Sequence, residues 1–182
     1  FDVQLSDCSA SGDGGGLYFD AYSGWADDQL VEDSSFDDNI ASYHGGAIYV
    51  SYANDLDISS SSFVGNSATG SGYAGGGLYS YSVSSRTVQG NTFCGNAASY
   101  GGAAYSYYTR GDDDWFNNIF VENTASSYGG ALYLYYDYYS DIVNNTFLGN
   151  TASAGGGLML LYTYADFLNN IVAWTQAGDG LM

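Results

Sequence analysis

The chain has 182 residues, 46% of them hydrophobic, and its 20 acidic residues face only two arginines, so the formal net charge is −18. This length suits one domain, and the apolar content excludes a disordered acidic tail. The charge argues against nucleic acid and against anionic membrane surfaces as partners, because both attract clustered basic residues. It favours bound cations or a salty medium that screens self-repulsion. No stretch approaches the ~18 consecutive apolar residues of a membrane span.

Two short phrases recur along the chain. The first is a glycine pair, then a small residue, an apolar residue and usually tyrosine, and it begins at residues 14, 45, 75, 101, 129 and 155. The second, Phe-x-x-Asn, begins at residues 36, 63, 93, 120 and 147, so its spacings are 27, 30, 27 and 27. Two markers that share one period near 27 residues predict a repeat architecture.

Each glycine phrase opens a segment of alternating residues, as in "GGAIYVSY" at 45–52 and "GGALYLYY" at 129–136. Such a period of two indicates a strand, and no helical stripe persists. One repeat is therefore expected to form one coil of two or three short strands, and stacked coils pair in parallel at ~4.8 Å. We predict an all-β, right-handed parallel β-helix of about six coils, a single domain over residues 1–182, because parallel crossovers are almost always right-handed.

The repeat also assigns residues to columns. An inward aliphatic ladder is expected from Leu17, Ile48, Leu78, Ala104, Leu132 and Leu158. An inward aromatic ladder is expected from Phe36, Phe63, Phe93, Phe120 and Phe147, followed by Val172. Two amide columns should satisfy backbone groups at turns, namely Asn39, Asn66, Asn96, Asn123 and Asn150, and Asn91, Asn118, Asn145 and Asn170. The glycine pairs permit positive φ and close backbone approach.

The two phrases, GG[AG][ILA] and FxxN at a period near 27 residues, together resemble the repeats of the polymorphic outer membrane proteins of chlamydiae. They are similar, more broadly, to bacterial right-handed β-helix repeat proteins. The resemblance covers about residues 5 to 175 and implies an extracellular or cell-surface location with a structural or adhesive role. Because the terminal segments remain patterned as coils and the chain starts at Phe1, we expect a segment of a longer chain or a filament subunit that assembles end to end or laterally.

Tyrosine is the most unusual component, with 20 copies. Strand alternation predicts that two columns of tyrosines point outward. The first column consists of Tyr18, Tyr49, Tyr79, Tyr105 and Tyr133. The second column consists of Tyr81, Tyr107 and Tyr135. More tyrosines crowd the following turn: Tyr108, Tyr136, Tyr138, Tyr139, Tyr162 and Tyr164. Tyrosine suits protein interfaces and sugar-ring stacking, so the columns are expected to contact another subunit or a glycan. The alternative function is thus a polysaccharide-binding module, and plain ladder stacking within the solenoid is the alternative interpretation.

A column of carboxylates lies six residues before the phenylalanine position, at Asp57, Asp114, Asp141 and Asp166, with Thr87 in the gap. Carboxylates ~5 Å apart repel each other unless cations intervene. Ca²⁺ accepts such oxygen ligands together with backbone carbonyls at turns, so this column is a candidate calcium site. The alternative is a solvated acidic edge that prevents aggregation.

We expect no enzyme and no required cofactor. Polysaccharide lyases and hydrolases with this fold need carboxylates beside Arg, Lys or His on one face. Here His44, the only histidine, precedes a glycine turn, and Arg86 and Arg110 are expected in loops of neighbouring coils. A groove that joins an arginine to Asp112–Asp114 remains the minor alternative. Cys8 and Cys94 should lie three coils apart, roughly 14 Å, which is too far for a disulfide.

Overall fold

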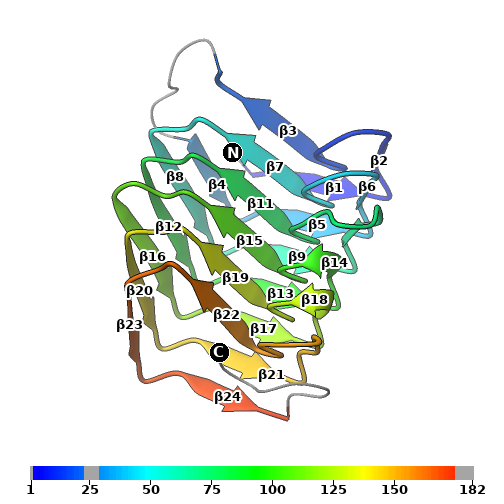
Figure 1. Cartoon of the computed structure of the whole chain (residues 1–182). Coiled ribbons are helices and arrows are strands. Elements are labelled where there is room, and N and C mark those ends of the chain that lie inside the picture. Colours follow the sequence, from blue (N-terminus) through cyan, green and yellow to red (C-terminus); the bar gives the residue numbers. More distant parts are fainter. Residues whose placement is uncertain (1, 23–28, 175–182) are drawn as a thin grey trace.

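The computed structural model describes residues 2–22 and 29–174, and these form a parallel β-solenoid without a helix (Figure 1). Its strands build four sheets of seven, five, six and six strands, and every strand pair is parallel. The expected all-β parallel solenoid of about six turns is confirmed. Most turns, however, contain four strands rather than two or three. The strands that the sequence did not predict include two-residue segments such as Ser67–Ala68, which are too short to show an alternation.

The strands stack in register along the solenoid, one from each coil (Figure 1). The phenylalanine sheet consists of β1 (Gln4–Ser6), β5 (Ser35–Asp37), β9 (Ser62–Val64), β13 (Thr92–Cys94), β17 (Ile119–Val121), β21 (Thr146–Leu148) and β24 (Ile171–Ala173). The short-strand sheet consists of β2 (Ser9–Ala10), β6 (Ile40–Ala41), β10 (Ser67–Ala68), β14 (Ala97–Tyr100) and β18 (Thr124–Tyr128).

The other two sheets carry the tyrosine and carboxylate columns that the sequence predicts. The tyrosine sheet consists of β3 (Leu17–Asp20), β7 (Ile48–Ser51), β11 (Leu78–Tyr81), β15 (Ala104–Tyr107), β19 (Leu132–Tyr135) and β22 (Leu158–Leu161). The acidic sheet consists of β4 (Gln29–Glu32), β8 (Asp55–Ser59), β12 (Ser85–Gln89), β16 (Asp112–Phe116), β20 (Tyr139–Val143) and β23 (Ala165–Leu168). The described residues contain no helix with the length and hydropathy needed to cross a membrane.

The core is built from the predicted ladders. Leu78 pairs with Ile48 on one side and with Ala104 on the other, and all three are fully buried. The phenylalanine rings stack in the same way: Phe63 and Phe93 lie 4.6 Å apart between centroids, with planes 8° from parallel. Val172 continues this column after Phe147, as the sequence predicts. Stacking identical side chains coil after coil removes them from water without gaps, which is the main stabilising effect of the fold.

Both amide columns are hydrogen-bonded ladders. Asn66 is typical: its side-chain amide donates to the carbonyl of Phe36 at 2.8 Å and to Oδ1 of Asn96 at 2.9 Å. The backbone N–H of Asn66 also donates to Asn96 Oδ1, at 3.0 Å. The second amide column has the same hydrogen bonds; for example, the side-chain amide of Asn91 donates to Oδ1 of Asn118 at 3.1 Å. Each buried amide therefore satisfies backbone groups that the tight turn would leave without partners.

The glycine phrase has two separate steric functions. Its first glycine adopts a left-handed conformation, with φ of 67° at Gly45. Its second glycine lets two coils touch, because a Cβ on Gly46 would overlap the carbonyl oxygen of Gly76 and the backbone of Ser67. The conformation and the contact together explain why the pair is repeated in every coil.

Candidate functional surface

The predicted tyrosine column projects from the outer face of the tyrosine sheet, in register from Tyr18 through Tyr49, Tyr79, Tyr105 and Tyr133 to Met159. The first four rings stack face to face, with centroids 5.0, 5.2 and 5.4 Å apart and planes within 9° of parallel. At Tyr133 the stack ends with an edge contact to Tyr105 at 89°. A second stack lies beside the first, with Tyr107 and Tyr135 5.2 Å apart.

The first column is less exposed than the sequence suggests. Tyr18 is 53% exposed, but Tyr79 is only 8% and Tyr133 only 5% exposed. The reason is lateral cover: the His44 ring lies 4.3 Å from Tyr79, and the rings of Tyr100 and Tyr128 pack against Tyr133. The expectation of a continuously exposed column is therefore corrected at Tyr79 and Tyr133. Stacking also uses the ring faces, so the column presents mainly ring edges and hydroxyls.

Burial keeps these phenols neutral. It raises the pKa of Tyr79 and of Tyr105 well above the usual tyrosine range, with neighbouring tyrosines adding to the shift. It raises the pKa of Tyr133 to about 12. The hydroxyl groups of this column are therefore uncharged hydrogen-bond donors and acceptors at any physiological pH.

The predicted carboxylate column has the expected register. Asp57 aligns with Thr87, Thr87 with Asp114, Asp114 with Asp141, and Asp141 with Asp166. Burial and then the charge of Asp141 raise the pKa of Asp114. The column stands within strands, where backbone carbonyls take part in the ladder hydrogen bonds, and not at turns where they could turn toward a cation. Within residues 2–22 and 29–174, no group of three or more His, Cys, Asp or Glu side chains could hold a metal ion.

The sequence predicts Arg86 in a loop, and this prediction is wrong. Arg86 lies in β12 and its side chain points into the core. Its guanidinium pairs with the Asp113 carboxylate, and Nε donates to Oδ1 at 3.0 Å. A further N–H donates to the Ser80 hydroxyl, and the Trp115 ring lies 4.9 Å from the guanidinium carbon. Strand alternation places Arg86 and Val88 on the same inward face, so the charge replaces a core aliphatic residue. Arg110, in contrast, is exposed between strands, as expected.

A second buried carboxylate completes this cluster from a turn. Asp137 Oδ1 accepts the backbone N–H of Thr109 at 2.7 Å. Its Oδ2 has no hydrogen-bond partner and lies 3.9 Å from Arg86 Nη2. Burial and the charge of Asp113 raise the pKa of Asp137 to about 7, against the opposing effect of Arg86. We refer to Arg86, Asp113 and Asp137 as the core ion cluster. A substrate at the surface cannot reach the Arg86–Asp113 pair, because both side chains are fully buried.

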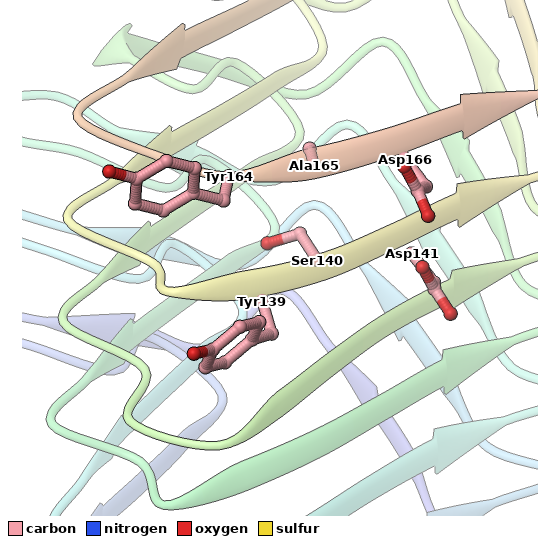
Figure 2. Close-up of a pocket in the computed structure, with 6 residues that line it drawn as sticks. All are labelled: Tyr139, Ser140, Asp141, Tyr164, Ala165 and Asp166. Carbon is pink, nitrogen blue, oxygen red and sulfur yellow. The ribbon is translucent and has the colours of Figure 1, made fainter.

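An open hollow of about 270 Å³ lies on the outer face of the acidic sheet, between β20 and β23. Figure 2 shows Tyr139 and Tyr164 at one end of it and the carboxylates of Asp141 and Asp166 at the other. A neighbouring hollow of about 390 Å³ shares Tyr164 and is otherwise lined by Tyr136, Tyr138, Tyr162 and Thr163. The sequence pattern places these tyrosines near one turn and the aspartates in one column. It does not bring them together, although the two-residue step from Tyr139 to Asp141 and from Tyr164 to Asp166 is a usable signal.

The remaining reactive side chains stay apart. His44 Nδ1 accepts the backbone N–H of Ala74 at 3.1 Å, and burial lowers the pKa of the imidazole. Cys8 and Cys94 are free thiols in different coils, as expected. The Asp13 carboxylate accepts the backbone N–H of His44 at 2.8 Å, and among the described residues neither thiol nor the histidine belongs to a group of three or more His, Cys, Asp or Glu side chains that could hold a metal ion.

A family model described as "Periplasmic copper-binding protein (NosD)" matches residues 2–129. Searches of curated proteins and of solved structures found no significant match. The family match agrees with the expected kinship to bacterial β-helix repeat proteins at the level of the fold. The likeness to the chlamydial repeats stays a resemblance of motifs.

Proposed function

The chain belongs to the NosD family of parallel β-helix repeat proteins, and from that premise we propose that it is a non-catalytic scaffold that acts outside the cytoplasm through contacts of its surface. The family description names a periplasmic protein, which supports a location beyond the inner membrane. An extracellular or cell-surface position is the narrower form of this proposal. The inaccessibility of the Arg86–Asp113 pair supports the absence of turnover, and so does His44, whose Nδ1 already accepts a backbone hydrogen bond.

Copper, which the family description names, does not fit the described residues. Protein copper sites are built from clustered imidazole, thiolate and thioether ligands. The only histidine of the chain, His44, already accepts a hydrogen bond through Nδ1, and the two cysteines lie in different coils. No acidic, cysteine or histidine group of three or more members forms a potential metal site over residues 2–22 and 29–174. The proposed function therefore involves no copper held by this segment.

The tyrosine layer on the outer face of the tyrosine sheet is the observation that carries the proposal. Its partly exposed rings lie side by side on one sheet face, whereas the apolar groups of ordinary surfaces are scattered singly. The second column, Tyr81, Tyr107 and Tyr135, is partly exposed along its whole length. Because the underlying strands are fixed by the ladders, these side chains lose little further freedom on contact. We propose that this face binds a second copy of the chain side by side, with ring edges and hydroxyls of both copies in contact.

Self-association at this face should depend on salt and on the second tyrosine column. The net charge of −18 repels two copies, so association is expected to increase between 20 and 500 mM NaCl as repulsion is screened. The double change Tyr107→Ser and Tyr135→Ser should weaken the dimer roughly tenfold, because it removes two central aromatic contacts. Sedimentation equilibrium over a range of protein concentrations measures both effects.

The matched control is Tyr139→Ser, which removes an exposed tyrosine from a different sheet and should leave the dimer unchanged. Circular dichroism confirms that all variants keep their strands. If the chain stays monomeric at high salt and millimolar concentration, lateral association is refuted. If Tyr139→Ser weakens the dimer as much as the double change does, the interface does not lie on the tyrosine sheet.

Polysaccharide binding by the first tyrosine column is the second candidate function. Tyrosine is favoured for it because sugar rings stack on aromatic faces while hydroxyl groups hydrogen-bond. In the near-parallel stack from Tyr18 to Tyr105, most ring faces are covered by a neighbouring tyrosine and cannot accept a sugar ring. Tyr18, at the end of the stack and 53% exposed, is the ring best placed to accept a sugar.

A further inference from the structure

The corner site, defined by Tyr139, Asp141, Tyr164 and Asp166, differs from the tyrosine sheet in how its rings are used. Tyr139 and Tyr164 occupy equivalent places in neighbouring coils, directly before the paired residues Ser140 and Ala165. They are 67% and 75% exposed, and no other described ring stacks on either of them. Both aromatic faces therefore remain available to a ligand.

The rings and carboxylates face the same space. Tyr139 begins β20 and Tyr164 lies directly before β23, and each is two residues from its aspartate, so both side chains of each coil project from the outer face of the acidic sheet. The residues between them, Ser140 and Ala165, point away toward the core (Figure 2). The result is a hollow of about 270 Å³ with aromatic groups at one end and carboxylates at the other.

Charge determines what such a hollow attracts. Asp141 and Asp166 are exposed, stand in register and make no ion pair or hydrogen bond with the described residues. Neither arginine forms an ion pair with these two carboxylates: Arg86 is buried with Asp113, and Arg110 lies over the Tyr108 ring at 5.2 Å. An aromatic face attracts a cation through its quadrupole, and a nearby carboxylate adds a direct Coulomb attraction.

We propose that the corner site binds a small alkylammonium cation, with the ammonium group between the tyrosine faces and the two carboxylates. The neighbouring hollow, lined by Tyr136, Tyr138 and Tyr162, extends the aromatic wall around Tyr164 and accommodates the apolar part of the ligand. An alkylammonium fits both the aromatic end and the carboxylate end of the corner site, because its positive charge is spread over methyl or methylene groups that pack on aromatic rings. A metal cation suits the site less, since two carboxylates provide too few oxygen ligands for Ca²⁺.

Choline and its uncharged isostere 3,3-dimethylbutan-1-ol separate this proposal from simple apolar binding. Ligand-observed NMR on the whole chain, at constant ionic strength, is expected to show choline binding that exceeds binding of the isostere by roughly tenfold. Tyr164→Leu should weaken choline binding roughly tenfold by removing the ring that both hollows share. The double change Asp141→Asn and Asp166→Asn should weaken choline binding by a similar factor, because it removes both negative charges and keeps the shape of the hollow.

Two control variants match these changes. Asp57→Asn removes an exposed carboxylate of the same column three coils away, and Tyr128→Leu removes a partly exposed tyrosine on the short-strand sheet. Both should bind choline as the wild type does. Equal binding of choline and the isostere, or equal losses in the controls, overturns the proposal. Binding to phosphatidylcholine vesicles without binding to free choline also overturns it in favour of a lipid headgroup.

The corner site and the proposed self-association can fail separately, because they occupy different sheets. Sedimentation of the Tyr164→Leu variant should show the same dimerisation as the wild type. Loss of choline binding in a Tyr81→Ser variant, whose ring contacts Tyr52 and Tyr107 and none of the tyrosines that line the hollows, would instead place the ligand on the tyrosine sheet and contradict the assignment.

Discussion

The core ion cluster is the most unusual feature at the scale of single residues. Two carboxylates, Asp113 and Asp137, share one arginine, Arg86, in a space that other coils fill with apolar side chains. Two buried carboxylates cannot both ionise beside a single cation without a large desolvation penalty, so one of them retains its proton. Asp137 is that group, because its Oδ2 makes no hydrogen bond and its pKa rises to about 7.

The proton on Asp137 links stability to pH. Its pKa is about 7 in the fold, against an ordinary value of 3.8 for this side chain. Because the folded pKa is the higher one, protonation stabilises the fold, and this stabilisation is complete below the unfolded pKa and is lost as pH rises through about 7. Relative to Asp137→Asn, the free energy of unfolding of the wild type should fall between pH 4 and 7, with a slope that approaches ~1.4 kcal/mol per pH unit.

Urea unfolding at several pH values, followed by tryptophan fluorescence, measures this difference. The asparagine keeps an Oδ1 acceptor for Thr109 and carries no charge. Asp57→Asn is the control, because this exposed residue stands between Leu30 and Thr87 in the sheet, and it should follow the wild-type curve. Parallel curves for the wild type and Asp137→Asn would mean that Asp137 does not take up a proton on folding.

At the scale of the element, one coil is defined by its contacts with the coils before and after it. A single strand of two to five residues has no stability of its own. The asparagine ladders close its turns, and the second glycine of each phrase brings adjacent backbones together. Coil spacing therefore depends on positions where no side chain is tolerated.

Gly46→Ala tests the coil contact directly. The added methyl group would overlap the carbonyl oxygen of Gly76, and neither backbone can move without separating two coils. We expect a loss of about 3 kcal/mol or more in the free energy of unfolding, at the upper end of overpacking effects. Gly12→Ala is the control, because a methyl group at that position would meet nothing within 4 Å. Thermal unfolding by circular dichroism should separate the two variants clearly, and similar melting temperatures would contradict the close-contact interpretation.

At the scale of the whole molecule, charge and shape act together. The net charge of −18 is distributed along a stack of about six coils, and the acidic sheet concentrates part of it in one column. Like charges at that spacing repel each other in the folded state more than in the unfolded chain. We therefore expect the fold to be more stable in a medium that contains screening cations.

Salt should stabilise the chain through screening. The melting temperature is expected to rise by several degrees between 10 and 300 mM NaCl, as the Debye length falls below the spacing of distant carboxylates. CaCl₂ at matched ionic strength should give the same curve, because the described aspartates do not form a metal-binding group. Differential scanning calorimetry measures both series. A calcium-specific increase that disappears in Asp114→Asn would instead establish the carboxylate column as a calcium site.

The sequence by itself determined the period, the parallel pairing and the main columns. Phe63, Phe93 and Phe120 stack where the spacing predicts, and Asn66, Asn96 and Asn123 bond as predicted. Such features are predictable because each coil of a solenoid contacts only the adjacent coils. A residue that recurs in every repeat therefore packs against the equivalent residue of the next coil. The alternation of a strand also determines locally which side chains point outward.

Only the tertiary structure decided what lies beside each column. It buried Arg86 with Asp113 from neighbouring strands of the acidic sheet and added Asp137 from a turn. It covered Tyr79 with His44, left the faces of Tyr139 and Tyr164 free, and opened the hollow beside Asp141 and Asp166. These outcomes depend on how far sheets and turns lie from one another around the coil, a distance that the spacing of residues along the chain does not contain.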